Sequence, residues 1–179
     1  MMYDHPPAPI VVCHDCTQAE KDTLKFLQHR GIRNINALAT VMGNIKQESK
    51  FDHLICEGGQ RTGYKGCTRG GFGLIQWTTQ NRYLGLGRFC RKYMLSPDTL
   101  NAQLRYMVNE NQWVQFERYL KSPGQSVAFY MKYAYNWLGW GIHGNRTHYA
   151  YNYVNRFKVI VPPAKVSTFF PIVPPPAVY

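Results

Sequence analysis

One carboxylate, that of Glu48, lies at the end of an apolar helical stripe and directly before a glycine-rich stretch. A helix is expected over INALATVMGNIKQES, residues 35–49, because its apolar residues recur at helical spacing. At about 100° per residue, Glu48 lies only about 20° around this helix from Val41 and about 60° from Ile45. Glu48 is therefore expected at the border of the buried face, where its carboxyl group is partly removed from water.

Partial burial of a carboxyl group disfavours its charged form and raises its pKa. An acid that stays protonated near neutral pH can give its proton to a leaving-group oxygen, which is what cleavage of a glycosidic bond requires. The alternative is that Glu48 is an ordinary surface residue that pairs with Lys46 or Lys50. The surrounding sequence has to decide between these two readings.

The composition limits the classes of protein that fit. A chain of 179 residues with 45% hydrophobic residues can bury a core and suits one domain better than two. The formal net charge of +11 favours polyanionic partners: nucleic acid, an anionic membrane surface or the bacterial cell wall. No apolar run approaches the roughly 18 residues of a membrane span, and the first residues do not resemble a signal peptide. We expect a soluble protein without membrane insertion that is not exported by a signal of its own.

Five cysteines are an odd and modest number, which argues against the disulfide framework of a small secreted protein. Cys13 and Cys16 form a CxxC pair, but no second pair or spaced histidines complete a zinc site, so no metal is expected. Cys56 and Cys67 bracket the glycine-rich stretch and would face each other if it folds back as a hairpin. Whether they bond depends on geometry that the sequence does not supply.

Capping residues predict where the first helices begin. Thr17 and Glu20 match a capping box ahead of a helix from about residue 18 to residue 30, and Asn34 can cap the helix that carries Glu48. The glycine-rich residues 56–73 have no helical period and predict a loop or a small β-hairpin. Thr78 or Thr79 then precedes a helix over residues 82–94.

Two Ser-Pro pairs predict the starts of later helices, because serine is a good N-cap and proline fits the first helical position. The pair at 96–97 precedes a helix through residue 107, and the pair at 122–123 precedes GQSVAFYMKYAYNWL. A last helix is expected over THYAYNYVNRF, before the prolines at 162–163. The expected fold class is therefore α+β, mostly helical, with one small β region.

The two ends of the chain differ in composition from the body. We expect an extended N-terminal arm over residues 1–16, a folded domain over 17–161 and a proline-rich, apolar C-terminal tail over 162–179. The tail has no periodicity and cannot form a core alone. Phe169 and Phe170 are unusual in a purely solvating tail. The tail is therefore either an extended docking peptide for another protein or a disordered end.

Three short motifs occur in an order that resembles a known group of enzymes. QES at 47–49, followed by Phe51, then GFGLIQW at 71–77 and AYNW at 134–137, resemble the signatures of goose-type lysozymes and lytic transglycosylases. The flanks GNIKQES and GLIQWT, together with Arg82, resemble the phage tail lysozymes more closely. The resemblance covers roughly residues 18–157 and leaves out both ends of the chain.

The resemblance implies a lysozyme-like fold and a role for each matching residue. Glu48 would be the general acid, Ser49 would support the site, and Gln76 would bind the sugar or the attacking group. Trp77 would stack on a sugar face, although a tryptophan is more often a core residue. Tyr135 would hydrogen-bond near Glu48 and Asn136 would position that helix, but packing alone also explains so aromatic a segment.

A second carboxylate would decide the mechanism. An inverting hydrolase needs a base about 6.5–9.5 Å from the acid, and a retaining one needs a nucleophile about 5–5.5 Å away. Asp52 would share the helical face of Glu48 if the helix continued. Glu57 begins the glycine-rich loop, where lysozyme-like folds hold their second carboxylate, and is the preferred candidate. If neither serves, a hydroxyl of the sugar itself attacks, which is lytic transglycosylase chemistry with an anhydro product.

The sequence thus predicts a muramidase that cleaves the β-1,4 bond between N-acetylmuramic acid and N-acetylglucosamine in bacterial peptidoglycan, without a cofactor. Arg61, Lys65 and Arg69 near the loop suit the acidic stems and phosphates of the wall. We expect a virion-associated enzyme, made in the host cytoplasm, whose two ends bind phage tail or baseplate proteins. The alternatives are a free endolysin, a lytic transglycosylase, and a catalytically silent virion adaptor. A nucleic-acid binder is disfavoured because the basic residues are scattered.

Overall fold

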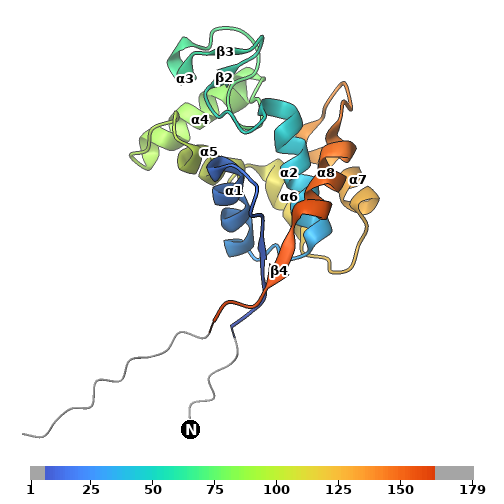
Figure 1. The fold of residues 1–179 in the computed structure, drawn as a ribbon. Coiled ribbons are helices and arrows are strands. Elements are labelled where there is room, and N and C mark those ends of the chain that lie inside the picture. Colours follow the sequence, from blue (N-terminus) through green and yellow to red (C-terminus); the bar gives the residue numbers. More distant parts are fainter. Residues whose placement is uncertain (1–6, 164–179) are drawn as a thin grey trace, which may run out of the picture.

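A computed structural model describes residues 7–163 of the chain, and within them a long central helix, α2, organises the fold (Figure 1). Every residue of α2 from Ala37 to Ile45 is buried, and the helix packs mainly against α8, α7 and α1. The expected α+β, mostly helical fold class is confirmed. The helices are α1 (Gln18–His29), α2 (Ile35–Ser49), α3 (Gly63–Gly66), α4 (Gln80–Lys92), α5 (Leu100–Met107), α6 (Asn111–Leu120), α7 (Val127–Leu138) and α8 (Arg146–Arg156).

Two small antiparallel sheets lie at opposite ends of the molecule (Figure 1). The hairpin of β2 (Ile55–Cys56) and β3 (Gln60–Arg61) lies beyond the C-terminal end of α2, inside the glycine-rich stretch. The other sheet pairs β1 (Ile10–Val12) with β4 (Lys158–Ile160), so that Ile10 lies opposite Ile160. Part of the segment expected to be an extended arm is therefore paired with the end of the folded body.

The local capping signals at the first helices are confirmed. The Thr17 side chain accepts a hydrogen bond from the Glu20 N–H, and the Glu20 carboxylate accepts one from the Thr17 N–H. Asn34 caps α2 by accepting from the Ala37 N–H, and Thr79 caps α4. Because these bonds satisfy N–H groups that have no partner within the helix, they define where each helix begins.

Both Ser-Pro predictions of a helix start are wrong, because a later side-chain oxygen caps each helix. Thr99 accepts from the Ala102 N–H, so α5 begins at Leu100, and Ser126 accepts from the Phe129 N–H, so α7 begins at Val127. Gly124, with a φ of 71°, lies between the second pair and its helix. Helix α6 was not predicted, although Trp113, Phe116 and Leu120 form its buried face at helical spacing.

Disulfide bonds close two short segments. Cys56 bonds to Cys67 across the β2–β3 hairpin, which answers the question that the sequence left open, and Cys13 bonds to Cys16 directly after β1. Cys90 is free and buried. Within residues 7–163, no helix is both long and apolar enough to cross a membrane. Most of the proposed docking tail, including Phe169 and Phe170, lies outside the described residues, as do residues 1–6 of the arm.

Candidate active site

Glu48 lies in the last turn of α2, and its carboxyl group is largely buried. The chain leaves the helix at once, because Lys50 and Phe51 adopt left-handed backbone angles with φ of 51° and 61°. The side chain of Glu48 keeps 17% of its surface exposed, and its Oε1 lies 2.7 Å from Nη2 of Arg146. The helix predicted over residues 35–49 is confirmed, and the Glu48 side chain at its end stays partly accessible to solvent.

Arg146 holds the carboxyl group of Glu48 from the first residue of α8. Its side chain is only 5% exposed, and its guanidinium carbon lies 4.4 Å from the ring centre of Trp140. Nη1 donates to Oδ1 of Asn44 at 3.3 Å, whereas the buried Nε has no hydrogen-bond partner within residues 7–163. Nothing local in the sequence distinguishes Arg146 from the other basic residues, so its contact with Glu48 could not be predicted.

Two opposing effects act on the Glu48 carboxyl group. Burial removes it from water and raises its pKa, which is the larger effect, while the positive charges of Arg146 and Arg82 lower the pKa. The net pKa is raised above the ordinary value of a glutamic acid. The site therefore combines a proton held at higher pH than usual with a cation that stabilises the carboxylate once the proton has left.

Ser49 and Gln76 connect the end of α2 to the turn over residues 72–77. The Ser49 hydroxyl donates to the Leu74 carbonyl at 2.7 Å. Gln76 has a left-handed φ of 53°, and its side-chain amide nitrogen donates to the carbonyls of Gly73 and Ile55 at 2.9 and 3.3 Å. The donors of the Gln76 amide thus hold the turn, and within residues 7–163 its side-chain oxygen accepts no hydrogen bond.

Ser49, beside the acid on α2, fastens the glycine-rich turn, so the structure brings the first two of the three motifs together. A comparison with protein families gives a match to the phage tail lysozyme family over residues 18–157. The chain belongs to this family. Neither the curated proteins nor the solved structures include a significant match. Membership implies a phage lysozyme-like function that acts on peptidoglycan, and the three motifs fall inside the matched residues.

Trp77, which the resemblance offered as a sugar platform, is a core residue in this member of the family. Its side chain is completely buried, its ring packs 5.3 Å from that of Tyr106, and its Nε1 donates to Oε1 of Glu110 at 2.8 Å. Arg82 makes two further hydrogen bonds to the Glu110 carboxylate, each 2.8 Å long. An indole enclosed in this way has no free face for a sugar, so the stacking prediction is wrong.

Tyr135 and Asn136 do not contact Glu48 directly. Tyr135 is half exposed, and its ring packs edge-on at 5.2 Å against Trp140, on which the Arg146 guanidinium lies. Asn136 is exposed and lines a cavity of about 450 Å³ between α6 and α7. Among the described contacts, no hydrogen bond joins Tyr135 to Glu48, so the predicted bond is absent from this structure.

Both candidates for a second carboxylate are held by the glycine-rich region. Burial alone would raise the pKa of Asp52, but hydrogen bonds from Arg61, at 2.7 Å, and from the Leu54 N–H lower it overall. Oε2 of Glu57 accepts from the Gly71 N–H at 2.8 Å. Within residues 7–163, the charges that shift the Glu48 pKa belong to arginines, and neither candidate carboxylate is among them.

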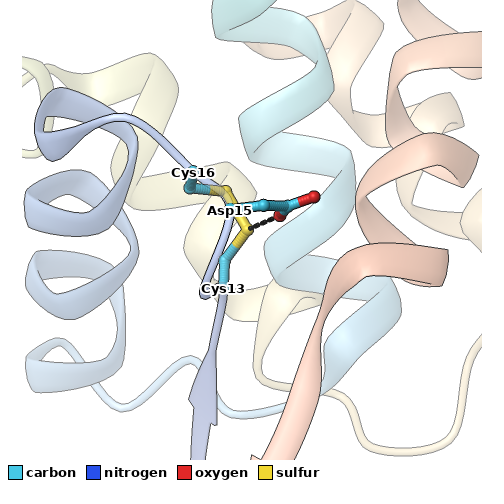
Figure 2. A group of neighbouring side chains, drawn as sticks. All are labelled: Cys13, Asp15 and Cys16. Carbon is cyan, nitrogen blue, oxygen red and sulfur yellow. Dashed lines mark hydrogen bonds between the residues drawn. A yellow bond between two sulfur atoms is a disulfide. The ribbon is translucent and has the colours of Figure 1, made fainter.

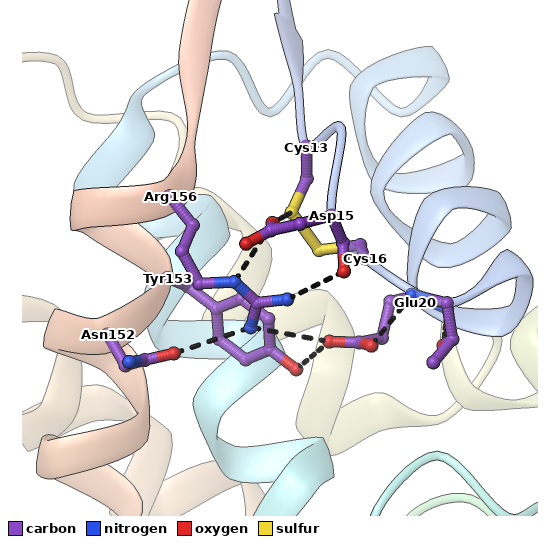
Figure 3. Close-up of polar contacts among 8 residues, drawn as sticks. Cys13, Asp15, Cys16, Glu20, Asn152, Tyr153 and Arg156 are labelled. Carbon is purple, nitrogen blue, oxygen red and sulfur yellow. Dashed lines mark hydrogen bonds and ion pairs between the residues drawn. A yellow bond between two sulfur atoms is a disulfide. The ribbon is translucent and has the colours of Figure 1, made fainter.

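One group of potential metal ligands occurs in the described part of the chain, formed by Cys13, Asp15 and Cys16 (Figure 2). The two sulfurs are bonded to each other, so neither is a thiolate ligand. Arg156 donates to Oδ1 of Asp15 at 3.1 Å and to its carbonyl at 3.3 Å, and lies 3.9 Å from the Glu20 carboxylate (Figure 3). These contacts fasten the disulfide turn to the end of α8.

Proposed function

We propose that the chain is a muramidase in which Glu48 is the general acid that cleaves the β-1,4 bond between N-acetylmuramic acid and N-acetylglucosamine. The observation that carries this proposal is the largely buried carboxyl group of Glu48, whose pKa is raised by burial although Arg146 contacts it. A general acid needs its proton at the working pH, and burial supplies this property. The family match supports peptidoglycan as the substrate class.

The proposed step transfers the Glu48 proton to the glycosidic oxygen. The bond between that oxygen and the anomeric carbon of the muramic acid then breaks, its electron pair stays on the departing N-acetylglucosamine hydroxyl, and an oxocarbenium-like centre remains. Glu48 becomes a carboxylate, whose charge Arg146 stabilises at 2.7 Å. In the second half of the reaction, a water molecule adds to the anomeric carbon and the carboxylate takes up its proton.

Ser49 and Gln76 have supporting roles in this proposal. Ser49 holds the turn over residues 72–77 against the last turn of α2. Because the donors of Gln76 are engaged with the turn, its amide oxygen is the group that accepts a hydrogen bond from a sugar hydroxyl or acetamido N–H. Tyr135 acts at a distance, by packing against the tryptophan on which the Arg146 guanidinium lies.

A lytic transglycosylase is the second candidate, and one observation favours it. Asp52 and Glu57 are engaged with their own loop, and neither contributes to the Glu48 pKa. With a single acid at the site, a hydroxyl of the muramic acid attacks the anomeric carbon in place of water, and an anhydro sugar forms. If Glu57 does serve in hydrolysis, its other carboxylate oxygen, Oε1, is the group that acts, because Oε2 accepts from the Gly71 N–H.

We also propose that the protein works as part of the phage particle. The family association with the phage tail supports a virion-borne enzyme that opens the wall locally. The proposed partners of the two chain ends are tail or baseplate proteins. A catalytically silent adaptor with the same fold is the alternative, and the intact acid on α2 argues against it.

The test is degradation of purified bacterial walls by the wild-type protein and by Glu48→Gln, with mass spectrometry of the released muropeptides. Glu48→Gln keeps the shape and hydrogen-bonding capacity of the side chain but removes the proton, so we expect at least a hundredfold loss of cleavage. Asp22→Asn is the matched control, because Asp22 is an exposed carboxylate of α1 that is no candidate for the second carboxylate, and it should retain activity.

The chemical ends of the products separate the candidates. Reducing ends identify the muramidase, and in that case Glu57→Gln shows whether the second carboxylate takes part. Anhydro ends identify the transglycosylase, and Glu57→Gln should then be active. Equal cleavage by wild type and Glu48→Gln would remove Glu48 from the mechanism, and no cleavage of walls from several hosts would favour the silent adaptor.

A further inference from the structure

A groove with an apolar floor lies between β1 and α1, away from Glu48. It has a volume of about 560 Å³, and its floor includes Val11 and Leu24, which are 5% and 3% exposed. The side-chain amide of Gln28 accepts from the Val11 N–H at 2.7 Å and donates to the Val11 carbonyl at 2.8 Å. Since Gln28 satisfies the backbone N–H and carbonyl of Val11 at this edge of β1, a ligand in the groove has no need to form hydrogen bonds with the strand there.

Positively charged side chains without a described ion-pair partner lie along the rim of the groove. Its exposed residues include Lys21, Lys25 and Arg33, together with His14 and His29, and none of the described residues that line the groove is a carboxylate. Within residues 7–163, none of the three cations forms an ion pair. The groove therefore combines apolar surface with cationic groups that have no described anionic partner, which is the electrostatic complement of an acidic, apolar ligand.

The position of the groove separates it from the candidate active site. The groove runs along α1 from Lys21 to Arg33, which precedes the first turn of α2. Glu48 lies in the last turn of α2, so about 20 Å of helix separates it from the Arg33 end of the groove. The groove also adjoins the β1–β4 sheet, where the described chain begins and ends (Figure 1). A protein bound there would leave the end of the molecule that carries Glu48 accessible.

We propose that the β1–α1 groove docks an extended segment of a partner protein in which acidic side chains alternate with apolar ones. Alternating side chains of an extended peptide point in opposite directions, so the apolar set enters the groove while the acidic set is free to approach the rim. Burial of the apolar set supplies affinity, and the lysines and Arg33 select for acidic partners. This inference concerns attachment and goes beyond the proposed cleavage reaction.

The probe for the test is a fluorescent peptide of alternating glutamate and valine, and its control is the same peptide with lysine in place of glutamate. We expect the acidic probe to bind the full chain, and nuclear magnetic resonance shifts to appear at Val11, Leu24 and Gln28. The doubly charge-reversed variant Lys21→Glu with Lys25→Glu should weaken binding about tenfold or more, a change of about 1.4 kcal/mol. Its wall-degrading activity should equal that of the wild type, since neither lysine is among the charges that act on the Glu48 carboxyl group.

The matched control is Arg88→Glu with Arg91→Glu, which changes the net charge by the same amount on exposed positions of α4. It should bind the acidic probe within about twofold of the wild type. Equal weakening by both variants would show that total charge and not the groove attracts the peptide. Absence of binding, or shifts confined to other surfaces, would overturn the proposal. Binding of phosphatidylglycerol vesicles through Lys21 and Lys25, without peptide binding, would assign the groove to a membrane surface instead.

Discussion

The pair of Glu48 and Arg146 determines at which pH the proposed acid holds its proton. The acid works while it is protonated, so cleavage should be lost as the pH rises through the raised Glu48 pKa. Arg146 opposes the effect of burial and lowers that pKa. Arg146→Gln should therefore move the basic limb of the kcat/KM profile to higher pH and, because the buried carboxylate loses its counter-charge, reduce the maximal rate.

Arg146→Lys is the matched variant, because it keeps the positive charge while it loses the flat stacking on Trp140. Its basic limb should stay nearer to that of the wild type than the limb of Arg146→Gln. The rate of wall degradation, measured from acidic to alkaline pH, gives the basic limb of each variant. A basic limb at the same pH in all three proteins would mean that the group observed to titrate is not Glu48.

Glu110 is a buried carboxylate that holds Trp77 and Arg82 in place. It accepts from Trp77 and from both nitrogens of the Arg82 fork, and its side chain is only 6% exposed. Glu110→Gln leaves Arg82 without its counter-charge and should lower the free energy of unfolding by about 3 kcal/mol. Urea denaturation measures this loss. Asp52→Asn, whose partner Arg61 is 62% exposed, should lower the free energy of unfolding by less than about 1 kcal/mol. Equal losses in the two variants would mean that the buried pair of Glu110 and Arg82 contributes no more to stability than an exposed pair.

Among the elements, the close approach of α2 and α8 places Glu48 against Arg146. A Cβ atom on Gly43 would lie 2.6 Å from the backbone nitrogen of Ala150 and 2.9 Å from the Arg146 carbonyl oxygen. Alanine in a helix is ordinarily more stable than glycine by about 0.5–1 kcal/mol. Gly43→Ala should nevertheless destabilise the protein by about 1–3 kcal/mol, because the two backbones must separate.

Thermal unfolding and wall cleavage together test this close approach. Gly141→Ala is the control, since a Cβ atom there meets nothing within 4 Å. Cleavage by folded Gly43→Ala should fall as well, because a displaced α8 moves Arg146 away from the acid. Stabilisation by Gly43→Ala would show that the helices are not in contact at this point.

The fold was predictable where it depends on neighbours in the sequence, and the rest depends on distant contacts. Local hydrogen bonds cap three helices at Thr17, Asn34 and Thr79, and the starts of these helices were predicted. For the third helix, the sequence left open whether Thr78 or Thr79 is the cap. The pairing of β1 with β4 joins residues 150 positions apart, and three apolar residues in a row do not reveal such a partner. Glu48 was predicted from its helical position, whereas Arg146 reaches it only because α8 packs on α2. The family resemblance located the turn that contains Trp77 but did not show whether the indole faces in or out.

The Cys56–Cys67 disulfide supports the turn behind the candidate site. It closes a segment with a sequence separation of 11, and for a loop of this size the loss of unfolded-state entropy stabilises the native state by about 3 kcal/mol. The double variant Cys56→Ser with Cys67→Ser should lower the free energy of unfolding by roughly this amount. Activity should fall at temperatures where the wild type is still active. An unchanged unfolding temperature under oxidising conditions would mean that the bond does not form in solution.

For the molecule as a whole, the two proposed functions, cleavage at Glu48 and docking in the β1–α1 groove, use different parts of the fold. The glycine-rich turn, Glu48 and Arg146 lie at one end of α2, and the β1–β4 sheet lies at the other, with the basic groove running from there along α1. An enzyme fixed to a particle has to expose its active site while it is held elsewhere. The separation of the two sites along one helix meets this requirement without a second domain.

The net charge of +11 adds a long-range attraction to a wall that is rich in carboxylates and phosphates. Raising the salt concentration from about 0.02 M to about 0.3 M shortens the range of this attraction and should slow wall degradation several-fold. An uncharged chitin-type oligosaccharide that the protein cleaves is the control, because its cleavage involves no attraction between net charges and should change little. Rates measured side by side on the two substrates test the idea. The same decline on both would mean that salt acts on the site around Glu48 and Arg146, and not on the approach of the basic molecule to the wall.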